Sequence, residues 1–236
     1  MLLEKMLQSQ GFGSRKECQL LIKKGFVRIE GEICDNPKQQ VQVENLTFQV
    51  FDECYQYREK VYIALNKPQG FECSHQPQHH QSVFSLLPEI LIQRNVQCVG
   101  RLDQDTTGLL LFTDDGQFLQ ALTHPRKHVA KVYRVVTADP VQPEQLTLLE
   151  TGVELRNEKG IYQATEVAQL AENQLQMTIH QGLYHQVKRM IAAVGNKVEH
   201  LHRQQVGQFS LSEDLAESEW YYLTAQEVEQ AKTQDS

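Results

Sequence analysis

Residues 14–24 carry the hydrophobic pattern of an amphipathic helix. Ser14 and Glu17 have the spacing of a capping box at its start, and Gly25 stands where a helix ends. The apolar face comprises Cys18, Leu21 and Ile22. The segment that follows, VRIEGEI, alternates around a Glu-Gly pair, which predicts a tight hairpin. Helices and a hairpin so close together predict a small α/β module, and we place it over residues 1–58.

Short strand patterns dominate the chain after residue 58, with helical patterns between them. Strands are predicted over 61–65, 96–100, 109–113, 132–136, 162–170 and 175–180. Helices are predicted over 117–123, 143–150 and 184–194. Because helix and strand do not alternate regularly, we expect an α+β fold with a mixed or antiparallel sheet over residues 59–236. The last dozen residues predict a frayed, acidic helical tail.

The composition indicates a folded protein of the cytoplasm. Apolar residues make up 40% of the chain, enough to form a core. No apolar run approaches the roughly 18 residues that span a bilayer, and the N-terminus lacks the pattern of a secretion signal. The cysteines are scattered without a CxxC pair, at positions 18, 34, 54, 73 and 98. This pattern favours reduced thiols over disulfides or a zinc site, so we expect a cytoplasmic protein without a membrane segment.

The formal net charge of −7 weakens an RNA-binding interpretation, but the charges are unevenly distributed. Residues 208–236 hold seven acidic residues against one lysine, whereas residues 180–207 hold four basic residues against one glutamate. Residues 1–50 hold seven basic residues against six acidic ones. Local potential steers a polyanion more than the global sum does, so the net charge does not exclude nucleic-acid binding.

The sequence GRLDQDTTGLLLFTDDG, residues 100–116, holds the sharpest candidate for chemistry. A strand-like segment leads into a polar turn that contains Asp103, and a continuous apolar strand follows. A reactive side chain is held still when both flanks of its loop are fixed in the core. Taken alone, however, an aspartate in a turn is more often a cap or a turn former, so the spacing does not decide its role.

The N-terminal module resembles the S4 RNA-binding domain. The resemblance lies in GFGSRKECQLLIKKGFVRIEGEI, residues 11–33. Because the second helix and the hairpin of that domain contact RNA, the resemblance implies a set of phosphate-facing side chains: Arg15, Lys16, Lys23, Lys24 and Arg28. From the residues alone, each of these is more commonly a solvated charge on a helix surface.

Four ordered motifs resemble the pseudouridine synthases that modify ribosomal RNA. They are LNKPQG (65–70), GRLDQDTTGLLLFTDDG (100–116), KVYRV (131–135) and GLYHQVKRMIAAVGNKVEHLHRQQVG (182–207). The resemblance implies that Asp103 is the catalytic nucleophile or base, that Tyr133 is the pocket tyrosine, and that Lys188 is the cation that pairs with the aspartate.

The last motif is similar to the small-subunit branch of that family. Large-subunit relatives more often carry an asparagine-arginine pair where Tyr184 and His185 stand, so a large-subunit substrate is the nearest alternative. The resemblance implies isomerisation of one uridine of 16S rRNA, uridine 516 in that branch, in free RNA or a small-subunit assembly intermediate. This isomerisation needs no redox change and no energy source, so we expect no nucleotide cofactor. We also expect no metal and a monomeric protein.

The implied roles of the side chains are physically coherent. Tyr133 is expected to stack on the target uracil with its hydroxyl near C5, after the base has left its stack. Arg101 is expected to fill the vacated space or to hold a flanking phosphate. Val187 is expected to form the apolar side of the uracil pocket, although core packing explains it equally well. Arg189 is a further candidate for RNA contact.

The helix predicted over 184–194 has two distinct faces. Its apolar stripe is predicted to comprise Tyr184, Val187, Ile191 and Val194. Its polar face is predicted to comprise His185, Lys188 and Arg189. A cation on that face, once beside Asp103, favours the ionised carboxylate that the chemistry requires.

Several alternatives remain open at this point. The aspartate attacks C1′ or the pyrimidine ring, or it removes the C2′ proton to give a glycal, and the sequence does not choose. An S4-type assembly factor with an inert second domain is an alternative of another class. A nuclease that holds a divalent ion with Asp103, Asp105, Asp114 and Asp115 is a third. The histidines 75, 79, 80, 200 and 202 have no ligand spacing that predicts a metal site.

Overall fold

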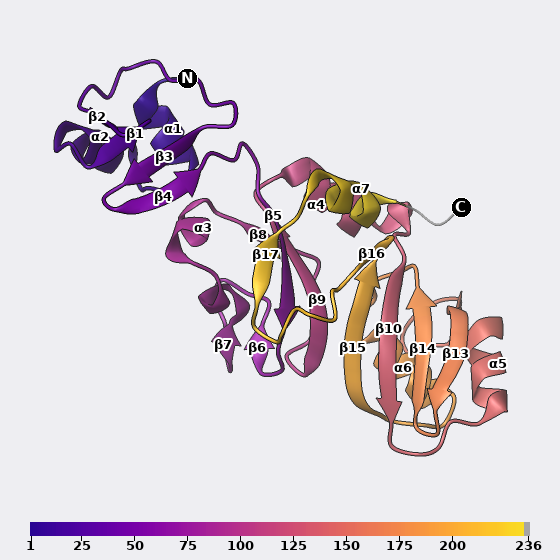
Figure 1. The fold of residues 1–236 in the computed structure, drawn as a ribbon. Helices are drawn as coiled ribbons and strands as arrows, with labels where there is room; N and C mark the ends of the chain where they lie inside the picture. Colours follow the sequence, from indigo (N-terminus) through magenta and orange to yellow (C-terminus); the bar gives the residue numbers. More distant parts are fainter. Residues whose placement is uncertain (234–236) are drawn as a thin grey trace. The chain divides into compact units, whose positions relative to one another are not determined.

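The computed structural model describes residues 1–233, which fold into two compact units. The N-terminal unit comprises Met1–Val61 and Leu87–Val96, and the C-terminal unit comprises Tyr62–Leu86 and the chain from Gln97 onward. Figure 1 shows both units, with colours that follow the sequence from indigo at the N-terminus to yellow at the C-terminus. A division of the chain between residues 58 and 59 stays a prediction. Within residues 1–233, no helix combines the length and apolarity needed to cross a membrane.

The N-terminal unit packs two helices on one face of a four-stranded antiparallel sheet. The helices are α1 (Leu3–Ser9) and α2 (Arg15–Lys23), and the strands are β1 (Val27–Ile29), β2 (Glu32–Cys34), β3 (Thr47–Val50) and β4 (Glu53–Gln56), in the order β2-β1-β3-β4. The core between them comprises Leu3, Met6, Leu7, Cys18, Ile22, Val27, Cys34, Val41, Phe48 and Val50. The other face of the sheet is not covered by these helices (Figure 1).

Local signals in the sequence fix the start of α2 and the first hairpin. The N–H of Ser14 donates to the Glu17 carboxylate (2.7 Å), and the N–H of Glu17 donates back to the Ser14 hydroxyl (3.4 Å), which confirms the capping box. Glu30 and Gly31 have φ values of +52° and +84°, as a two-residue hairpin turn requires, so the predicted hairpin is also confirmed.

A short helix from the middle of the chain completes the N-terminal unit. It is α3 (Glu89–Gln93), and the Arg94 guanidinium that follows donates to the Gln10 side chain and to the Arg58 carbonyl, each at 3.0 Å. Gly11, at φ +91°, lies so close that a Cβ there would be 2.2 Å from the Ile90 carbonyl oxygen. Only glycine permits this approach.

The C-terminal unit is built on a mixed nine-stranded sheet. Its central path runs β13 (Thr165–Ala171), β14 (Gln174–Ile179), β10 (Lys131–Thr137), β15 (Val198–Val206), β9 (Thr106–Thr113), β5 (Tyr62–Lys67) and β17 (Trp220–Tyr222). Two further strands join it, β16 (Phe209–Ser210) beside β15 and β8 (Gln97–Val99) beside β9. All pairs are antiparallel except β9 with β15, which is parallel. The predicted α+β class with a mixed sheet is confirmed.

Short helices and two small ladders surround this sheet. The helices are η1 (Val83–Leu86), α4 (Gly116–Thr123), η2 (Pro125–Lys127), α5 (Pro143–Thr151), α6 (Gln186–Ala193) and α7 (Ala225–Lys232). The ladders pair β6 (Phe71–Glu72) with β7 (Gln81–Ser82), and β11 (Val153–Glu154) with β12 (Ile161–Tyr162). Helices α4 and α7 share one hydrophobic core with the sheet. The helical predictions over 117–123 and 143–150 therefore agree closely with α4 and α5.

Helix α7 differs from the frayed tail that its composition predicted. It begins with a second capping box, Thr224 with Glu227, and it buries Val228 and Ala231 in the core under α4. The predicted helix is confirmed, but the prediction that it is frayed was wrong, because charge content alone does not show a buried apolar stripe. Residues 234–236 of the predicted tail lie outside the described residues.

The central strand β9 is buried along its whole length, and one glycine allows its parallel neighbour to approach. All eight residues of β9 are buried. Gly108, at φ +98°, faces the backbone of β15, where an added Cβ would lie 2.4 Å from the Arg203 carbonyl oxygen. The pairing of β9 with β15 sets Thr106 opposite Leu201, so the loop that precedes β9 lies beside β15. The candidate site lies at this loop.

Candidate active site

Asp103 lies on the loop between β8 and β9, and a buried lysine holds the backbone of that loop. Lys67, at the end of β5, is 0% exposed. Its Nζ donates to the carbonyl oxygens of Asp103 (3.1 Å), Thr106 (2.9 Å), Gln104 (3.4 Å) and Pro68 (3.1 Å). Burial lowers the pKa of Lys67. The carbonyl oxygens replace the hydration shell of the ammonium, so this one side chain holds the backbone of the loop in place.

The Asp103 carboxylate is paired with Lys188 from helix α6. Lys188 Nζ lies 3.1 Å from Asp103 Oδ2 and 2.6 Å from Asp105 Oδ1, so one ammonium joins two carboxylates of the same loop. Burial opposes the charged form of Lys188, but hydrogen bonds to Asp105 and Asp103 outweigh it and raise the pKa of the lysine. Burial is the largest single influence on Asp105 and raises its pKa, but the hydrogen bond and the charge of Lys188 act together with smaller contributions to lower that pKa overall.

A histidine completes the surroundings of the Asp103 carboxylate. His185 Nε2 lies 3.3 Å from Asp103 Oδ2. His185 has φ +51° in the turn before α6, and the Tyr184 ring stacks on it at a centroid distance of 3.7 Å. Tyr184 is 71% exposed, so its predicted place in the apolar stripe of the helix was wrong. The helix begins at Gln186 rather than at residue 184, and the turn before it has no helical periodicity.

Asp103, Tyr133 and Lys188 line one cavity of about 770 Å³ in the C-terminal unit. Tyr133, on β10, is only 7% exposed and pairs across the sheet with Arg203 of β15. Val187, buried in α6, lines the same cavity. The volume lies in the range that holds small ligands, roughly 300–1,000 Å³. Three segments that are distant in the sequence thus converge, as the motifs predicted.

Two further cations lie in the cavity wall. Lys131 donates from Nζ to the Val129 carbonyl at 2.8 Å, and burial lowers the pKa of Lys131 to about 8. Arg203 is 3% exposed and donates from Nε to the Leu109 carbonyl at 2.8 Å. Its Nη2 has no hydrogen-bond partner among the described residues. The wall therefore carries positive charge beyond that of Lys188.

The two other arginines predicted for this unit lie in different surroundings. Arg101 is exposed and lines the cavity beside the Asp103 loop. Arg189 turns toward another segment, where it contacts the Glu158 carboxylate at 3.1 Å and the carbonyl oxygens of Tyr184 and Arg156. Arg189 is not among the residues that line the cavity, so the structure gives it a contact within the chain and leaves an RNA contact as a prediction.

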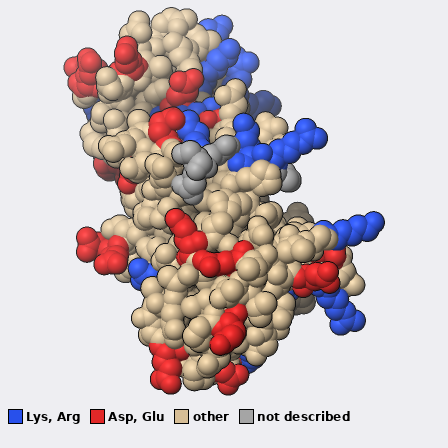
Figure 2. Space-filling view, turned by 90° about the vertical axis from the view of Figure 1, so that its right-hand side faces the viewer, with Lys and Arg blue, Asp and Glu red and all other residues tan. Residues whose placement is uncertain are grey.

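The predicted phosphate-facing residues of the N-terminal unit are exposed. Lys16 and Lys23 lie on α2, Lys24 is the C-cap residue that follows it, and Arg28 lies on β1. Arg15 differs from them, because its guanidinium lies 2.6 Å from the buried carboxylate of Glu4. Hydrogen bonds from Gln19 and then Arg15 lower the pKa of Glu4. Figure 2 shows one group of Lys and Arg side chains at the upper right of the view and others beside acidic side chains.

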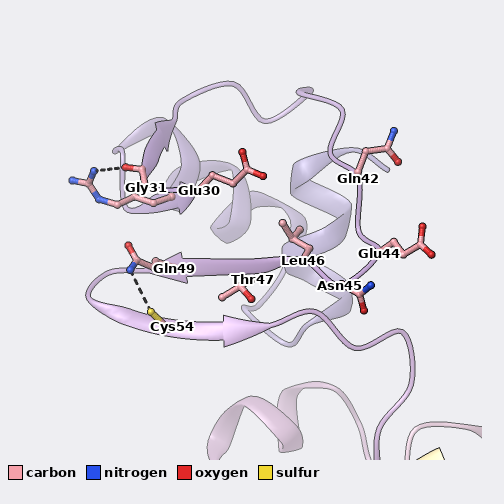
Figure 3. Close-up of a pocket in the computed structure, with 10 residues that line it drawn as sticks. Glu30, Gly31, Gln42, Glu44, Asn45, Leu46, Thr47, Gln49 and Cys54 are labelled. Atoms are coloured by element: carbon pink, nitrogen blue, oxygen red, sulfur yellow. Dashed lines mark hydrogen bonds between the residues drawn. The ribbon is translucent and has the colours of Figure 1, made fainter.

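A polar hollow of about 440 Å³ lies on the open face of the N-terminal sheet. Figure 3 shows that its wall is formed by the first hairpin, by β3 and β4, and by the loop before β3. Arg28 donates to the Gly31 carbonyl at 3.2 Å, and Gln49 donates to Cys54 Sγ at 3.2 Å. The carboxylates of Glu30 and Glu44 lie at the hollow, which disfavours a phosphate there.

The histidines and the acid cluster do not form a metal site. The hydroxyl of Thr107 contacts His202 Nδ1 at 2.9 Å and His200 Nε2 at 3.2 Å, which explains this pair by contacts within the sheet. Asp115 accepts from the N–H of Gln117 and from the Tyr62 hydroxyl, so it caps helix α4. Within residues 1–233, no group of three or more His, Cys, Asp or Glu is placed to hold a metal ion, as the nuclease alternative requires.

Three residues of the site were not identified from the sequence as site residues: Lys67, Asp105 and His185. Lys67 stands in the LNKPQG motif, two residues beyond the strand predicted over 61–65, and lysines are rarely buried, so no local pattern indicated its place beside the Asp103 loop. Asp105 was considered only as a metal ligand, although its two-residue spacing from Asp103 places both carboxylates near one cation. His185 had one signal, its place beside Lys188 on the predicted polar face of the helix, but its contact with Asp103 depends on the turn before α6.

Comparison with known proteins identifies the relatives of both units. Residues 61–193 match the family described as RNA pseudouridylate synthase, and residues 1–46 match the S4 domain. A ribosomal small subunit pseudouridine synthase A of Vibrio vulnificus is 40% identical over 97% of this chain and 98% of that protein. The protein of the same description in Vibrio cholerae is 46% identical over 71% of this chain and 72% of its own length. A crystal structure of a pseudouridylate synthase superposes with a TM-score of 0.69 at 36% identity, over 98% of this chain and 99% of the other.

Proposed function

This chain belongs to the RNA pseudouridylate synthase family, and we propose that it converts one uridine of small-subunit ribosomal RNA to pseudouridine. The observation that carries the proposal is the convergence of Asp103, Tyr133 and Lys188 on one cavity. The descriptions of the Vibrio relatives support a small-subunit substrate. The proposed target is uridine 516 of 16S rRNA, and such a substrate places the reaction in the cytoplasm.

The proposed reaction uses Asp103 as its central group. Isomerisation breaks the N1–C1′ bond of the uridine, turns the uracil and joins C5 to C1′. An ionised carboxylate is needed for attack on C1′ or on the ring, and equally for removal of the C2′ proton. The Lys188 ammonium lies 3.1 Å from Asp103 Oδ2 and holds the carboxylate in position, and Lys67 fixes the backbone that carries it.

The cavity wall supplies the remaining functions. The target base must leave its stack to reach Asp103, and the Tyr133 ring offers a surface for the uracil with a hydroxyl for proton transfer at C5. Val187 forms an apolar part of the wall. Arg101, exposed beside the loop, is placed to contact a flanking phosphate. No step calls on a metal or a nucleotide cofactor.

The N-terminal unit is proposed to bind RNA through exposed cations of α2 and its C-cap: Lys16, Lys23 and Lys24. Arg15 and Arg28 are proposed to have a lesser role, because Arg15 pairs with Glu4 and Arg28 lies at the acidic hollow. The match of residues 1–46 to the S4 domain supports this assignment. Phosphate contacts of this kind position the RNA without reading its sequence. The choice of uridine then depends on contacts in the cavity of the C-terminal unit and on the structure of the RNA.

The direct test incubates the protein with unmodified 16S rRNA, with a partly assembled small subunit and with 23S rRNA, in the presence of a chelator. Pseudouridine is mapped by carbodiimide labelling and primer extension. We expect one stop on a small-subunit substrate and none on 23S rRNA. A stop on 23S rRNA alone would overturn the small-subunit assignment, and no stop on any substrate with folded protein would overturn catalysis.

A further inference from the structure

Two cations of the cavity wall, Lys131 and Arg203, take no part in the reaction proposed for Asp103. Both line the same cavity as Tyr133. Arg203 pairs across the sheet with Tyr133, and Lys131 precedes Tyr133 by two residues on β10. Residues two apart on a strand share one face, so the three side chains belong to one surface of the sheet. The ring proposed to stack on the uracil is therefore accompanied by two positive charges.

Neither of these cations forms an ion pair among the described residues. Lys131 Nζ donates there to the Val129 carbonyl alone, at 2.8 Å, although an ammonium can donate several hydrogen bonds. The Arg203 guanidinium donates from Nε to the Leu109 carbonyl, and its buried Nη2 has no partner among the described residues. The cavity wall thus holds hydrogen-bond donors and positive charge that the fold itself does not use.

The other lysines of the site differ from Lys131 in their partners. Lys67 is buried, but its ammonium is surrounded by carbonyl oxygens, and Lys188 contacts two carboxylates. Lys131 instead pairs with the apolar Ile179 on β14 and Val206 on β15. Burial, and then the charge of Arg203, lower the pKa of Lys131 to about 8, so the amine is still mostly protonated at pH 7. A cation with so few partners costs the fold free energy, as is common at binding sites.

The proposed isomerisation places negative charge on the base whichever route Asp103 takes. If the N1–C1′ bond breaks first, its electron pair stays with the uracil and is spread over O2 and O4. If the carboxylate adds to the ring, the charge is carried by the same carbonyl system. As C5 then bonds to C1′, C5 loses a proton and N1 gains one. Donors aimed at a position where charge develops accelerate a reaction more than donors that bind the substrate only.

We propose that Lys131 donates a hydrogen bond to a carbonyl oxygen of the target uracil, and that Lys131 and Arg203 together stabilise the negative charge on the base while it is detached from the ribose. This inference rests on the proposed function and adds two residues to it. Apolar neighbours favour a flat base here over a phosphate, whose full charge needs more donors. Where the oxygen is O4, the contact also excludes cytidine, whose amino group donates at that position.

The first experiment measures single-turnover pseudouridine formation on small-subunit RNA by Lys131→Met, Lys131→Arg and the control Lys197→Met. We expect Lys131→Met to lower the rate by about 100-fold or more while the Kd for RNA changes by less than about twofold. Lys131→Arg keeps a cationic donor and should stay within about tenfold of the parent. Lys197 is 75% exposed, and its variant should behave as the parent.

Stability separates this role from a purely structural one. Lys131→Met removes the cost of burying a charge, so its urea midpoint should be unchanged or higher. A lower midpoint, with equal losses of rate in Lys131→Met and Lys131→Arg, would overturn the proposal. A rate for Lys131→Met equal to that of the parent would overturn it as well.

Sulfur at O2 or at O4 of the target uridine tests the contact from the RNA side, because sulfur is the weaker acceptor. At one of the two positions the substitution should slow the parent about tenfold more than it slows Lys131→Met. The position that shows this coupling identifies the oxygen. Equal slowing of both proteins at both positions would contradict the contact, and with a Kd raised for every RNA it would place Lys131 at a phosphate.

Acetylation of the parent protein by acetic anhydride gives a measurement that needs neither a variant nor turnover. With 16S rRNA bound, we expect loss of Lys131 acetylation and unchanged acetylation of Lys197; RNA with cytidine at position 516 should not protect Lys131. Equal labelling of Lys131 with and without 16S rRNA would contradict base binding at this site. If the parent modifies no RNA, the proposed function is contradicted, and protection of Lys131 decides separately whether the cavity binds the base.

Discussion

The lysines that surround Asp103 in the C-terminal unit are buried or half-buried and paired, whereas the lysines at the end of α2 in the N-terminal unit are exposed. Lys67 and Lys188 contact defined oxygen atoms around Asp103 at 2.6 to 3.4 Å. Lys23 and Lys24, at the end of α2, extend into solvent. The difference follows from what each region must hold. A reacting carboxylate needs fixed geometry, whereas a flexible polyanion is attracted by charge at a distance.

Asp103→Asn is expected to give the largest difference between loss of pseudouridine formation and loss of RNA binding. The substitution keeps the shape of the side chain and removes the charge, so single-turnover pseudouridine formation should fall by about 1,000-fold or more. Binding of the same RNA, measured by filter retention at matched salt, should change by less than about twofold because the N-terminal cations are intact. A parallel loss of binding would show that Asp103 has a structural role.

Lys67→Met tests whether the buried lysine acts by holding the loop. The change leaves carbonyl oxygens around Asp103 without a donor, at about 1–3 kcal/mol for each that stays unsatisfied. We expect a lower urea midpoint and a kcat reduced by about 100-fold with a smaller change in KM. Lys197→Met, at a 75% exposed lysine of the same unit, is the control and should alter neither quantity.

Neutralising the N-terminal cations should have a smaller effect of another kind. The double variant Lys23→Gln with Lys24→Gln should weaken RNA binding by about tenfold and reduce the slope of log K against log salt by about 2. The rate at saturating RNA should stay that of the parent. A double variant at Lys5 and Lys38 removes equal charge from the same unit, and an equal loss there would contradict a specific role for α2.

The smallest effect is expected for Asp105, the second carboxylate that contacts Lys188. Because Lys188 lowers the pKa of Asp105, this ion pair stabilises the fold above the unfolded-state pKa, and its contribution is lost as pH falls through the folded value. Asp105 is 44% exposed, so Asp105→Asn should reduce the free energy of unfolding at pH 7 by only about 1 kcal/mol or less. The difference from the parent should shrink as pH falls below the unfolded-state pKa of about 3.9 and vanish once the carboxyl of the folded protein is protonated; a difference that persisted after protonation would exclude the ion pair as its cause.

Local chemistry made part of the structure predictable. The capping box of α2 and the Glu30–Gly31 turn depend on residues that are neighbours in the sequence, and both formed as expected. The convergence of Asp103, Tyr133 and Lys188 was also anticipated, but from the order of four motifs rather than from any spacing. Residue patterns alone left Asp103 as an ordinary turn aspartate.

Features that depend on long-range packing were not predictable in this way. The segment 87–96 joins the N-terminal unit through Arg94, whose partners lie in residues 10 and 58. Tyr184 is exposed because the chain turns before α6, and helical periodicity cannot show where a helix starts late. The parallel contact of β9 with β15 depends on a close approach at Gly108 that no local pattern reveals.

Because Lys67 is fully buried, its chemical labelling reports the motion of the Asp103 loop away from β5. Lys67 is 0% exposed, and its ammonium donates hydrogen bonds to carbonyl oxygens from two chain segments. Reagents that acylate lysines therefore reach it only when the end of β5 separates from the Asp103 loop. Acylation of Lys67 in time-resolved labelling therefore measures the frequency of that opening, against the rapid labelling of Lys197. In an enzyme whose carboxylate must stay in place, the lifetime of this closed state sets the fraction of molecules ready to react.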